Sequence, residues 1–270
     1  MNISEQPGNR ETELADALAT LRTRVETAAE NAGRKIEEIE LLPITKFFPA
    51  TDIAILFELG CRSFGEAREQ EAAQKIAELP AMVGEGATDV RWHMVGQIQR
   101  NKAKAIAGWA DTAHSVSGAK VVTALDRAAT RALDDGTRAE PLHIYIQLSL
   151  DGDPGRGGVD VDDPAAVDTM CAQVADAHGL QLVGVMGVPP LGADPDVAFA
   201  RFAQEHRRVM GDHPQATGLS AGMSGDLELA VKHGSTCVRV GTALMGARPL
   251  TSPGVVTPVT SSSQVPNFQG

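Results

Sequence analysis

The stretch of sequence that decides the fold is Leu41-Leu42-Pro43-Ile44-Thr45-Lys46-Phe47-Phe48-Pro49. Its apolar run is typical of a buried strand between polar segments, and Pro49 marks the turn that leaves the strand. Lys46 therefore lies at the carboxyl end of a core strand, where α/β sheets place their ligands. Two interpretations stay open at this point. The amine either simply reaches solvent or acts as a nucleophile that forms a Schiff base with an aldehyde.

Apolar runs that are typical of strands continue along the chain at residues 61–65, 90–96, 112–116, 142–149, 181–187, 217–222 and 237–241. Helical patterns fill the gaps at residues 52–59, 66–79, 101–107, 118–133, 164–178, 195–210 and 226–233, and a longer helix over residues 12–32 precedes the first strand. Eight strands that alternate with helices predict a parallel sheet, and eight is the number that closes a barrel. We therefore predict an α/β fold, a single TIM-type (β/α)8 barrel with an extra N-terminal helix.

A two-domain Rossmann arrangement is the alternative fold. It is weakened because no strand is followed by a Gly-x-Gly-x-x-Gly motif, and Gly84-Glu85-Gly86 falls in a loop. The two ends differ in composition from the barrel, since no charged residue follows Arg248. We predict a disordered N-terminus over residues 1–10, the barrel over residues 11–249 and a flexible tail over residues 250–270.

Composition and charge restrict the function. The 270 residues are 43% hydrophobic, enough for a large core, and carry a formal net charge of -11. That charge argues against a nucleic-acid partner and an anionic membrane surface, and no apolar stretch approaches the roughly 18 residues that span a bilayer. Cys61, Cys171 and Cys237 lie far apart, so we expect no disulfide framework, no metal site and a cytoplasmic location.

Two segments late in the chain are typical of anion sites. Residues 219–226 follow the seventh strand, and Ser224 is a natural N-cap for the helix that comes next. The eighth strand ends in Gly241-Thr242, which open a second short helix. Free amides at helix N-termini bind phosphate, and in barrels the loops after strands seven and eight often form a phosphate site. Helix capping alone would also explain Ser224.

Arg239 lies inside the apolar eighth strand, where an unpaired guanidinium would be costly. Its offset of two residues from Gly241 turns it to the same face, toward the mouth of the barrel. An ion pair with a carboxylate on a neighbouring strand is the alternative role. An amine after the first strand and a phosphate site after the last two fit a ligand with an aldehyde and a phosphate. Pyridoxal 5'-phosphate (PLP) has both groups.

The chain resembles the pyridoxal phosphate homeostasis proteins, also called the proline synthase co-transcribed family. These are single-domain barrels similar to the barrel half of bacterial alanine racemase. The resemblance covers about residues 12–248 and rests on five motifs in the same order. They are the Lys46 segment, Phe64-Gly65-Glu66, Trp92-His93-Met94-Val95-Gly96 with Gln99 and Asn101-Lys102, residues 219–226, and Arg239-Val240-Gly241-Thr242. Any one motif alone would be weak, but five in order are specific.

The resemblance implies roles for individual residues. Lys46 would form the Schiff base with PLP, and Arg239 would face the pyridine nitrogen. The phosphate would be surrounded by Ser220, Met223, Ser224, Gly241 and Thr242. One position departs from the family pattern, which usually reads Gly-Glu-Asn after the second strand, whereas this chain has Gly65-Glu66-Ala67. Any polar contact of that asparagine is therefore absent or supplied differently.

An arginine at the pyridine nitrogen leaves that nitrogen unprotonated, so the ring supports carbanion chemistry poorly. A two-base racemase also needs a second acid or base, and the single tyrosine, Tyr145, falls within the fifth strand. We therefore predict a PLP-binding protein that takes part in intracellular PLP homeostasis, hands the cofactor over and has little or no catalysis. The alternative is a PLP-dependent amino-acid racemase with His93 as the second base, although a hydrogen-bonded interior histidine would also explain His93.

Other segments give weaker indications. Residues 151–158 lack the glycine that a calcium loop needs, and we expect a mobile loop over the mouth, with Arg156 near an anionic ligand. Arg100, Lys102 and Lys104 at the start of a helix indicate a solvated face, with a contact to apo PLP-dependent client enzymes as the alternative. A protein–protein role for the uncharged tail rests on its composition alone. We expect a monomer.

Overall fold

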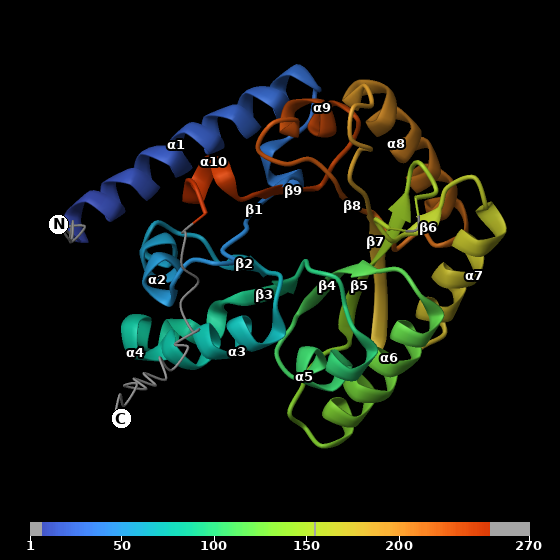
Figure 1. Ribbon diagram of the computed structural model, residues 1–270, viewed down its shortest axis with the longest axis horizontal. Helices are drawn as coiled ribbons and strands as arrows, with labels where there is room; N and C mark the ends of the chain where they lie inside the picture. The colour runs from blue at the N-terminus through green and yellow to red at the C-terminus, as the bar shows by residue number, and fades with distance from the viewer. Residues whose placement is uncertain (1–6, 154, 249–270) are drawn as a thin grey trace, which may run out of the picture.

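A ring of parallel strands forms the centre of the computed structural model, which describes residues 7–153 and 155–248 (Figure 1). The strands of the ring are β1 (Glu40–Pro43), β2 (Ser63–Glu66), β3 (Arg91–Met94), β4 (Thr112–Val116), β5 (Leu142–Ser149), β7 (Leu180–Met186), β8 (Gly218–Ser220) and β9 (Cys237–Val240). Their spatial order is β1-β9-β8-β7-β5-β4-β3-β2, and the short β6 (Val159–Asp160) pairs with the end of β5.

The ring closes between β1 and β2. The last strand pairs with the first in a register that runs from Glu40 opposite Cys237 to Pro43 opposite Val240. On the other side of β1, a single bridge joins Ile44 to Gly65, and the Thr45 amide donates to the Gly65 carbonyl at 3.0 Å. The predicted α/β fold of TIM type is therefore confirmed, and the Rossmann alternative is excluded.

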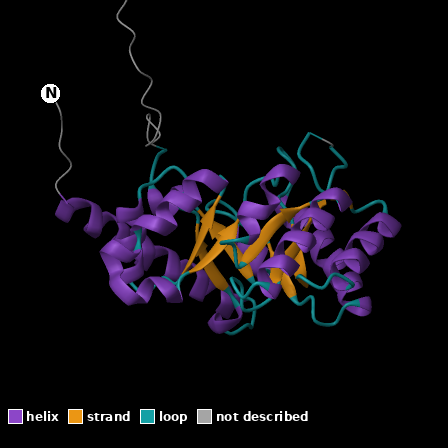
Figure 2. Ribbon diagram, turned by 90° about the horizontal axis from the view of Figure 1, so that it is seen from below, coloured by secondary structure: helices purple, strands orange, loops and turns teal. Residues whose placement is uncertain are grey.

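Helices surround the strands on the outside, as both ribbon views show (Figure 2). They are α1 (Pro7–Asn31), α2 (Ala50–Glu58), α3 (Glu69–Glu78), α4 (Pro80–Val83), α5 (Ala103–Ala107), α6 (Ala119–Asp134), α7 (Pro164–Ala175), α8 (Pro195–Asp212), α9 (Leu227–Lys232) and α10 (Thr242–Met245). Short 3-10 turns span Ile36–Glu38, Gly84–Asp89 and Arg100–Lys102.

The extra N-terminal helix is present and begins earlier than predicted. The predicted apolar face of α1 is fully buried, and α1 packs along α2, α9 and α10. Residues 7–10, which we expected to be disordered, are helical because Arg10 is held by the buried Asp52 at 2.6 Å and by the Met245 carbonyl at 3.0 Å. Residues 1–6 and the predicted tail over residues 250–270 lie outside the described residues.

The strands alternate between two environments. In β5, Leu142, Ile144 and Ile146 are fully buried against the outer helices, whereas Tyr145 and Gln147 belong to the opposite, inward face. The same alternation in the other strands fills the interior of the barrel with side chains, in contrast to the apolar outer layer. The interior contains buried polar side chains and opens into a cavity at the carboxyl ends of the strands.

Candidate functional site

The cavity at the carboxyl ends of the strands has a volume of about 500 Å³. Six of the seven predicted site residues line it: Lys46, Met223, Ser224, Arg239, Gly241 and Thr242. Val95, Ser115, Gln147 and Met186, from β3, β4, β5 and β7 or the residues just after them, complete much of the wall. The barrel therefore brings together an amine from its first strand and the loops that follow its last two strands.

Lys46 follows β1 and is half-buried. Its amine makes no hydrogen bond or ion pair with any described residue and lies 5.9 Å from the centroid of the Phe47 ring. Phe47 is the one non-glycine residue in the described part of the chain with a positive φ, at 75°. Backbone strain of this kind persists only where surrounding contacts hold it. Here the Glu71 carboxylate accepts the Phe47 amide proton in a short hydrogen bond.

A buried ionic network fixes Thr45, the residue that precedes Lys46. The Lys75 ammonium donates to Glu66 Oε1 at 2.8 Å, to Glu71 Oε1 at 2.7 Å and to the Thr45 carbonyl at 2.9 Å. The Thr45 hydroxyl donates to the same Glu66 oxygen at 2.6 Å. Burial raises the pKa of the Glu66 carboxyl, and the positive charge of Lys75 opposes this shift. The network therefore anchors both neighbours of Lys46.

From the sequence, Glu66 was recognised only as part of a motif, and Lys75 was not recognised as a residue of the site. One pattern could have drawn attention to it, because Glu71 and Lys75 are four residues apart on one face of a predicted helix. The helical spacing does not reveal that Lys75 is only 4% exposed and Glu66 not exposed at all. Their burial follows from the packing of α3 over β2.

Arg239 projects from β9 into the floor of the cavity and is almost completely buried. Its Nη1 donates to the Ser220 hydroxyl at 2.5 Å and its Nη2 to the Gly187 carbonyl at 3.0 Å. Burial lowers the pKa of the guanidinium, which stays protonated because arginine titrates far above neutrality. Among the described residues no carboxylate pairs with Arg239, so the ion pair that we considered as its alternative role is not found.

Ser220 does not line the cavity. Its side chain is completely buried beneath Arg239, at the end of β8. The resemblance implied that Ser220 lies at the phosphate, but its hydroxyl is occupied by the guanidinium and by a ring nitrogen of His114 at 2.9 Å. Ser220 thus supports Arg239 and has no surface in the cavity.

His114 continues this chain of hydrogen bonds through the barrel interior. The Ser220 oxygen, which accepts from Arg239, lies 2.9 Å from His114 Nδ1 in a second hydrogen bond, and His114 Nε2 is hydrogen-bonded to His93 Nδ1 at 2.9 Å. Burial lowers the pKa of His93 and lowers that of His114 well below its usual range, which favours the neutral form of both rings. The His114 ring also stacks on Tyr145, with centroids 4.5 Å apart.

Neither His93 nor Tyr145 lines the cavity. His93 is the hydrogen-bonded interior histidine that the sequence analysis gave as its other interpretation. Among the described residues that line the cavity, Lys46 and Arg239 are the only ones with titratable side chains. A second acid or base for racemisation is therefore missing from the described wall.

The rim formed by the loops after β8 and β9 carries unpaired backbone donors. The amides of Ser224, Gly225 and Thr242 have no hydrogen-bond acceptor among the described residues. The Ser224 hydroxyl accepts from the Ala243 amide at 3.2 Å and so joins the two loops. The prediction that Ser224 caps the next helix was wrong. The N-cap of α9 is Asp226, whose carboxylate accepts from the Met223 amide at 2.6 Å and turns the chain before the helix begins.

Ala67, which replaces the family's usual asparagine, lies after β2 and does not line the cavity. Its backbone packs against Gly96 so closely that a Cβ on Gly96 would lie 2.1 Å from the Ala67 carbonyl oxygen. A glycine is therefore required at residue 96. The contact depends on the backbone of Ala67, and any side chain at residue 67 preserves it.

The loop that carries Arg156 is held by its own contacts. Arg156 pairs with Asp151 at 3.1 Å and donates to the Pro189 carbonyl at 2.8 Å. Gln147, which lines the cavity, donates to the Arg156 carbonyl at 3.1 Å. The loop thus lies next to the cavity as expected, but the Arg156 guanidinium is already occupied. Residue 154 lies outside the described residues.

Comparison with known proteins identifies the family. A family model described as "Alanine racemase, N-terminal domain" matches residues 17–249. The chain is also 62% identical over 256 residues to the pyridoxal phosphate homeostasis protein of Mycobacterium tuberculosis strain H37Rv. This match covers 93% of this chain and 99% of that protein. The chain belongs to the pyridoxal phosphate homeostasis protein family. The resemblance stated from its motifs is therefore confirmed.

Two further relatives of this family support the assignment. The pyridoxal phosphate homeostasis protein of Escherichia coli strain K12 is 33% identical, over 87% of this chain and 97% of that protein. The structure of PipY from Synechococcus elongatus with PLP bound matches with a TM-score of 0.71 and 32% identity, over 86% of this chain and 100% of that chain. The relatives from Mycobacterium tuberculosis and Escherichia coli carry the name of homeostasis proteins and not of racemases, in agreement with the expectation of a cofactor-holding protein.

No described helix combines the length and the apolar character needed to cross a bilayer. No group of three or more described His, Cys, Asp or Glu residues is arranged to hold a metal ion.

Proposed function

We propose that this protein binds PLP in the cavity, holds it as a Schiff base on Lys46 and takes part in PLP homeostasis with little or no catalysis. The observation that carries the proposal is that an unpaired amine and a rim of unpaired amides share one cavity of about 500 Å³. That volume lies within the range of roughly 300–1,000 Å³ that is usual for cofactor sites. PipY, which is bound to PLP in its structure, supports the choice of ligand.

The chain's own residues divide the work of binding. The amides of Ser224, Gly225 and Thr242 would bind the phosphate, since three convergent N–H donors stabilise an anion without a lysine or a metal. Arg239, held by Ser220 and Gly187, would present its guanidinium to the ring nitrogen. When bound, PLP supplies an aldehyde for the lysine and an electron-accepting ring.

The same residues limit catalysis. Arg239 stays protonated and would keep the ring nitrogen unprotonated, which weakens the ring as an electron acceptor. No described titratable group other than Lys46 and Arg239 lines the cavity, so no described residue is placed to exchange a proton on the second face of a bound amino acid. We therefore infer that the site holds and releases the cofactor.

The test is an absorbance titration of the purified protein with PLP. We expect a new band near the visible edge that disappears after borohydride reduction, with the cofactor then fixed to residue 46 in a peptide map. Lys46→Ala should not form the band, whereas the matched control Lys35→Ala, an exposed lysine with no ion pair in the described structure, should form it fully. A reduced cofactor mapped to another lysine would refute the proposal.

A second measurement separates holding from catalysis. Purified protein loaded with PLP is incubated with L-alanine in deuterated water, and exchange of the Cα proton is followed by NMR. We expect exchange no faster than with free PLP. Rapid exchange or racemisation would refute the non-catalytic assignment and restore the racemase alternative.

The remaining assignments extend the same proposal. Apo PLP-dependent enzymes would receive the cofactor, and the protein would act as a cytoplasmic monomer. Three buried, unpaired cysteines among the described residues fit a reducing compartment. Sedimentation velocity tests the monomer directly, and a concentration-independent dimer would contradict it.

A further inference from the structure

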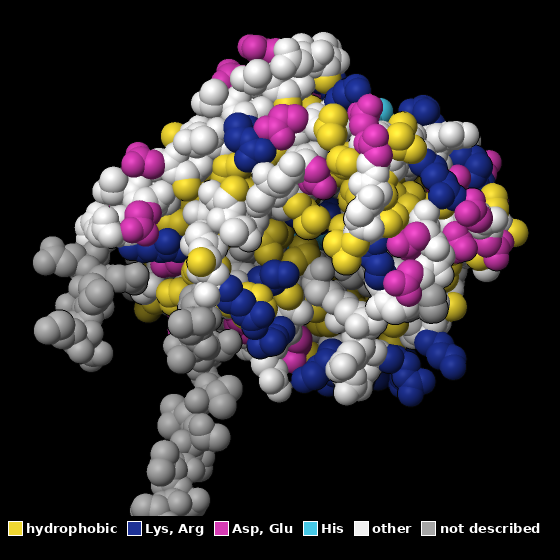
Figure 3. Space-filling model, turned by 45° about the horizontal axis from the view of Figure 1, so that its top comes forward, with side chains coloured by type: hydrophobic (Ala, Val, Ile, Leu, Met, Phe, Trp, Pro, Cys, Tyr) yellow, Lys and Arg dark blue, Asp and Glu magenta, His cyan; other side chains and the backbone are white. Residues whose placement is uncertain are grey.

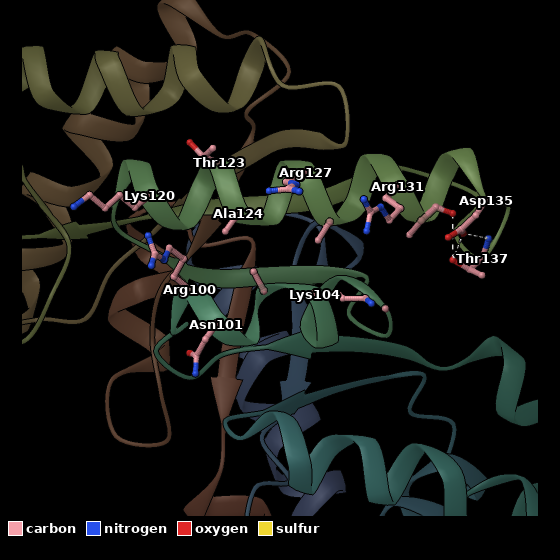
Figure 4. A pocket seen from close by; sticks show the side chains of 14 residues that line it. Arg100, Asn101, Lys104, Lys120, Thr123, Ala124, Arg127, Arg131, Asp135 and Thr137 are labelled. Carbon is pink, nitrogen blue, oxygen red and sulfur yellow. Dashed lines mark hydrogen bonds between the residues drawn. The ribbon is translucent and has the colours of Figure 1, made fainter.

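A second cavity, of about 650 Å³, lies in the outer wall of the barrel between α5 and α6. Five cationic side chains line it: Arg100, Lys104, Lys120, Arg127 and Arg131. Figure 4 shows Lys120, Arg127 and Arg131 in a row along α6, across from Arg100 and Lys104 on the neighbouring segment. We call this cavity the basic groove.

The cations of the basic groove are exposed and have no ionic partner in the described part of the chain. None of the five forms an ion pair or a side-chain hydrogen bond with another described residue. The adjacent Lys102 behaves differently, because it pairs with Glu69 at 3.0 Å. One carboxylate, Asp135, lies at the far end of the groove, where it is bound to Thr137. On a chain with a net charge of -11, such a cluster of unpaired cations is a local exception.

The groove is long and has an apolar floor. Lys120, Arg127 and Arg131 repeat at helical spacing, so they share one face of α6 over about 16 Å. Between the charged rims the floor consists of small side chains, including Ala103, Ala124 and others that line the same cavity. On the face that Figure 3 shows, Lys and Arg side chains gather along the lower edge, on the side that carries α5 and α6 in Figure 1.

One end of the groove meets the mouth of the barrel. Arg100 follows the carboxyl end of β3, and Lys120 follows that of β4. Val95 and Ser115, which line the candidate PLP cavity, lie five residues before each of these cations along the chain. Because all strands of the ring run parallel, both cations lie on the rim that surrounds the mouth.

We propose that the basic groove docks an acidic amphipathic segment of a partner protein. Cations on both rims would pair with its carboxylates, and the alanine floor would contact its apolar side chains. A small anion would reach only part of a row of charges about 16 Å long. Single-stranded nucleic acid usually needs aromatic side chains to stack its bases, and no described aromatic residue lines the groove.

Docking in the basic groove does not depend on the proposed cofactor role, but the position of the groove links docking to that role. A partner held between α5 and α6 lies beside the rim of the PLP cavity. Acidic segments near the active sites of apo-enzymes would therefore be recognised by their charge, and the partner would stay next to the site from which the cofactor leaves.

The test uses a fluorescein-labelled helical peptide of about 18 residues with glutamates on two faces and leucines on the third, followed by anisotropy. The groove variant is Arg127→Glu with Arg131→Glu. The control is Lys35→Glu with Arg207→Glu, two exposed cations elsewhere on the barrel, with the same change in net charge. We expect saturable binding that is weakened roughly tenfold or more in the groove variant only, and weakened in all proteins by 0.5 M salt.

Several outcomes would overturn the proposal. Equal weakening in both variants would show that net charge alone drives binding, and unaltered binding in the groove variant would place the peptide elsewhere. Tighter binding of a single-stranded 20-nucleotide DNA than of the peptide would indicate a nucleic-acid site. Equal binding of a peptide with serines in place of the leucines would refute a role for the apolar floor. Circular dichroism and the PLP absorbance titration should be unchanged in the groove variant, which keeps this test independent of the cofactor proposal.

Discussion

The Glu66 carboxylate is enclosed on all sides next to the proposed Schiff-base lysine. One of its oxygens binds Lys75 and Thr45, whereas Oε2 has no hydrogen-bond partner among the described residues. A buried charge without its counterion is strongly destabilising, so the pair with Lys75 is what makes this carboxylate tolerable. The strained backbone of Phe47 is held by Glu71 of the same network.

We expect Lys75→Met to lower the free energy of unfolding by about 3–5 kcal/mol, because it leaves Glu66 buried and unpaired. Urea denaturation measures this loss. The double variant Glu66→Leu with Lys75→Met should recover much of it. Lys102→Met is the matched control, since it breaks the more exposed pair with Glu69 and should cost less than about 1 kcal/mol. Equal costs for the two lysine variants would contradict the buried network.

The buried histidines predict how stability depends on pH. Burial lowers the pKa of His93 and His114 in the folded protein, whereas in the unfolded chain histidines titrate near pH 6.5. The unfolded state therefore binds more protons below that pH. The contribution of these histidines to the free energy of unfolding is complete above about pH 6.5 and is lost as the pH falls. Each such group contributes at most about 1.4 kcal/mol per pH unit.

We expect urea unfolding to show a lower free energy at pH 5.5 than at pH 7.5, with a smaller difference in His114→Asn. The charged or titratable groups that act on this pair are Arg239, Glu40, Arg91, Asp111 and His143. The pKa of His206 is also lowered by burial, and His206 contributes equally to both proteins. His178→Asn, an exposed histidine, should keep the pH dependence of the unaltered chain. An unchanged slope in His114→Asn would show that this ring does not stay neutral in the fold.

At the scale of elements, the turn between β8 and α9 depends on Gly222. Its φ is +89°, and a Cβ there would lie 2.5 Å from that of Ala230. We expect Gly222→Ala to lower the free energy of unfolding by about 3 kcal/mol, from backbone strain together with a clash. Gly234→Ala has a similar φ but open space and should cost about 1 kcal/mol.

The third member of this series is Gly225→Ala, in the same loop as Gly222. Its φ is not in the left-handed region and a Cβ would meet nothing within 4 Å, so its effect on urea unfolding should be close to zero. Similar costs for all three variants would mean that the loop adapts and that the close approach to α9 is unimportant.

Apolar runs predicted all eight strands of the ring, and their bounds agree to within a few residues. The elements that sequence periodicity overlooked are the short ones, β6 and α4, which are too brief to show a period. The wrong N-cap has a physical origin. Ser224 and Asp226 are both good caps, and the backbone conformation of the loop decides between them.

The site was predictable in part. Lys46, Gly241 and Thr242 could be placed because residues at the carboxyl ends of parallel strands meet at one edge of the sheet. The chain of hydrogen bonds from Arg239 to His93 could not, because it needs the depth of each side chain inside the barrel. That depth is set by the register of strands β3, β4, β8 and β9, which a single sequence does not reveal.

At the scale of the whole molecule, cofactor binding should stabilise the fold. A ligand that binds only the folded state adds about 2.7 kcal/mol at a hundredfold excess over its dissociation constant. We expect urea unfolding with saturating PLP to show a gain of this order in the unaltered chain and in Lys35→Ala, and little gain in Lys46→Ala. An equal gain in Lys46→Ala would contradict this prediction, because it would show that PLP stabilises the fold without the covalent bond to Lys46.

The pairing of β1 with β9 has a consequence for how the molecule is made. The two partners lie about 200 residues apart in sequence, so the loop that must close before they meet is nearly as long as the barrel itself. Contacts this distant slow folding, and the nascent polypeptide exposes an unpaired edge of β1 until its last strand has left the ribosome. Newly synthesised molecules should therefore gain the capacity to bind PLP only at the final step of folding.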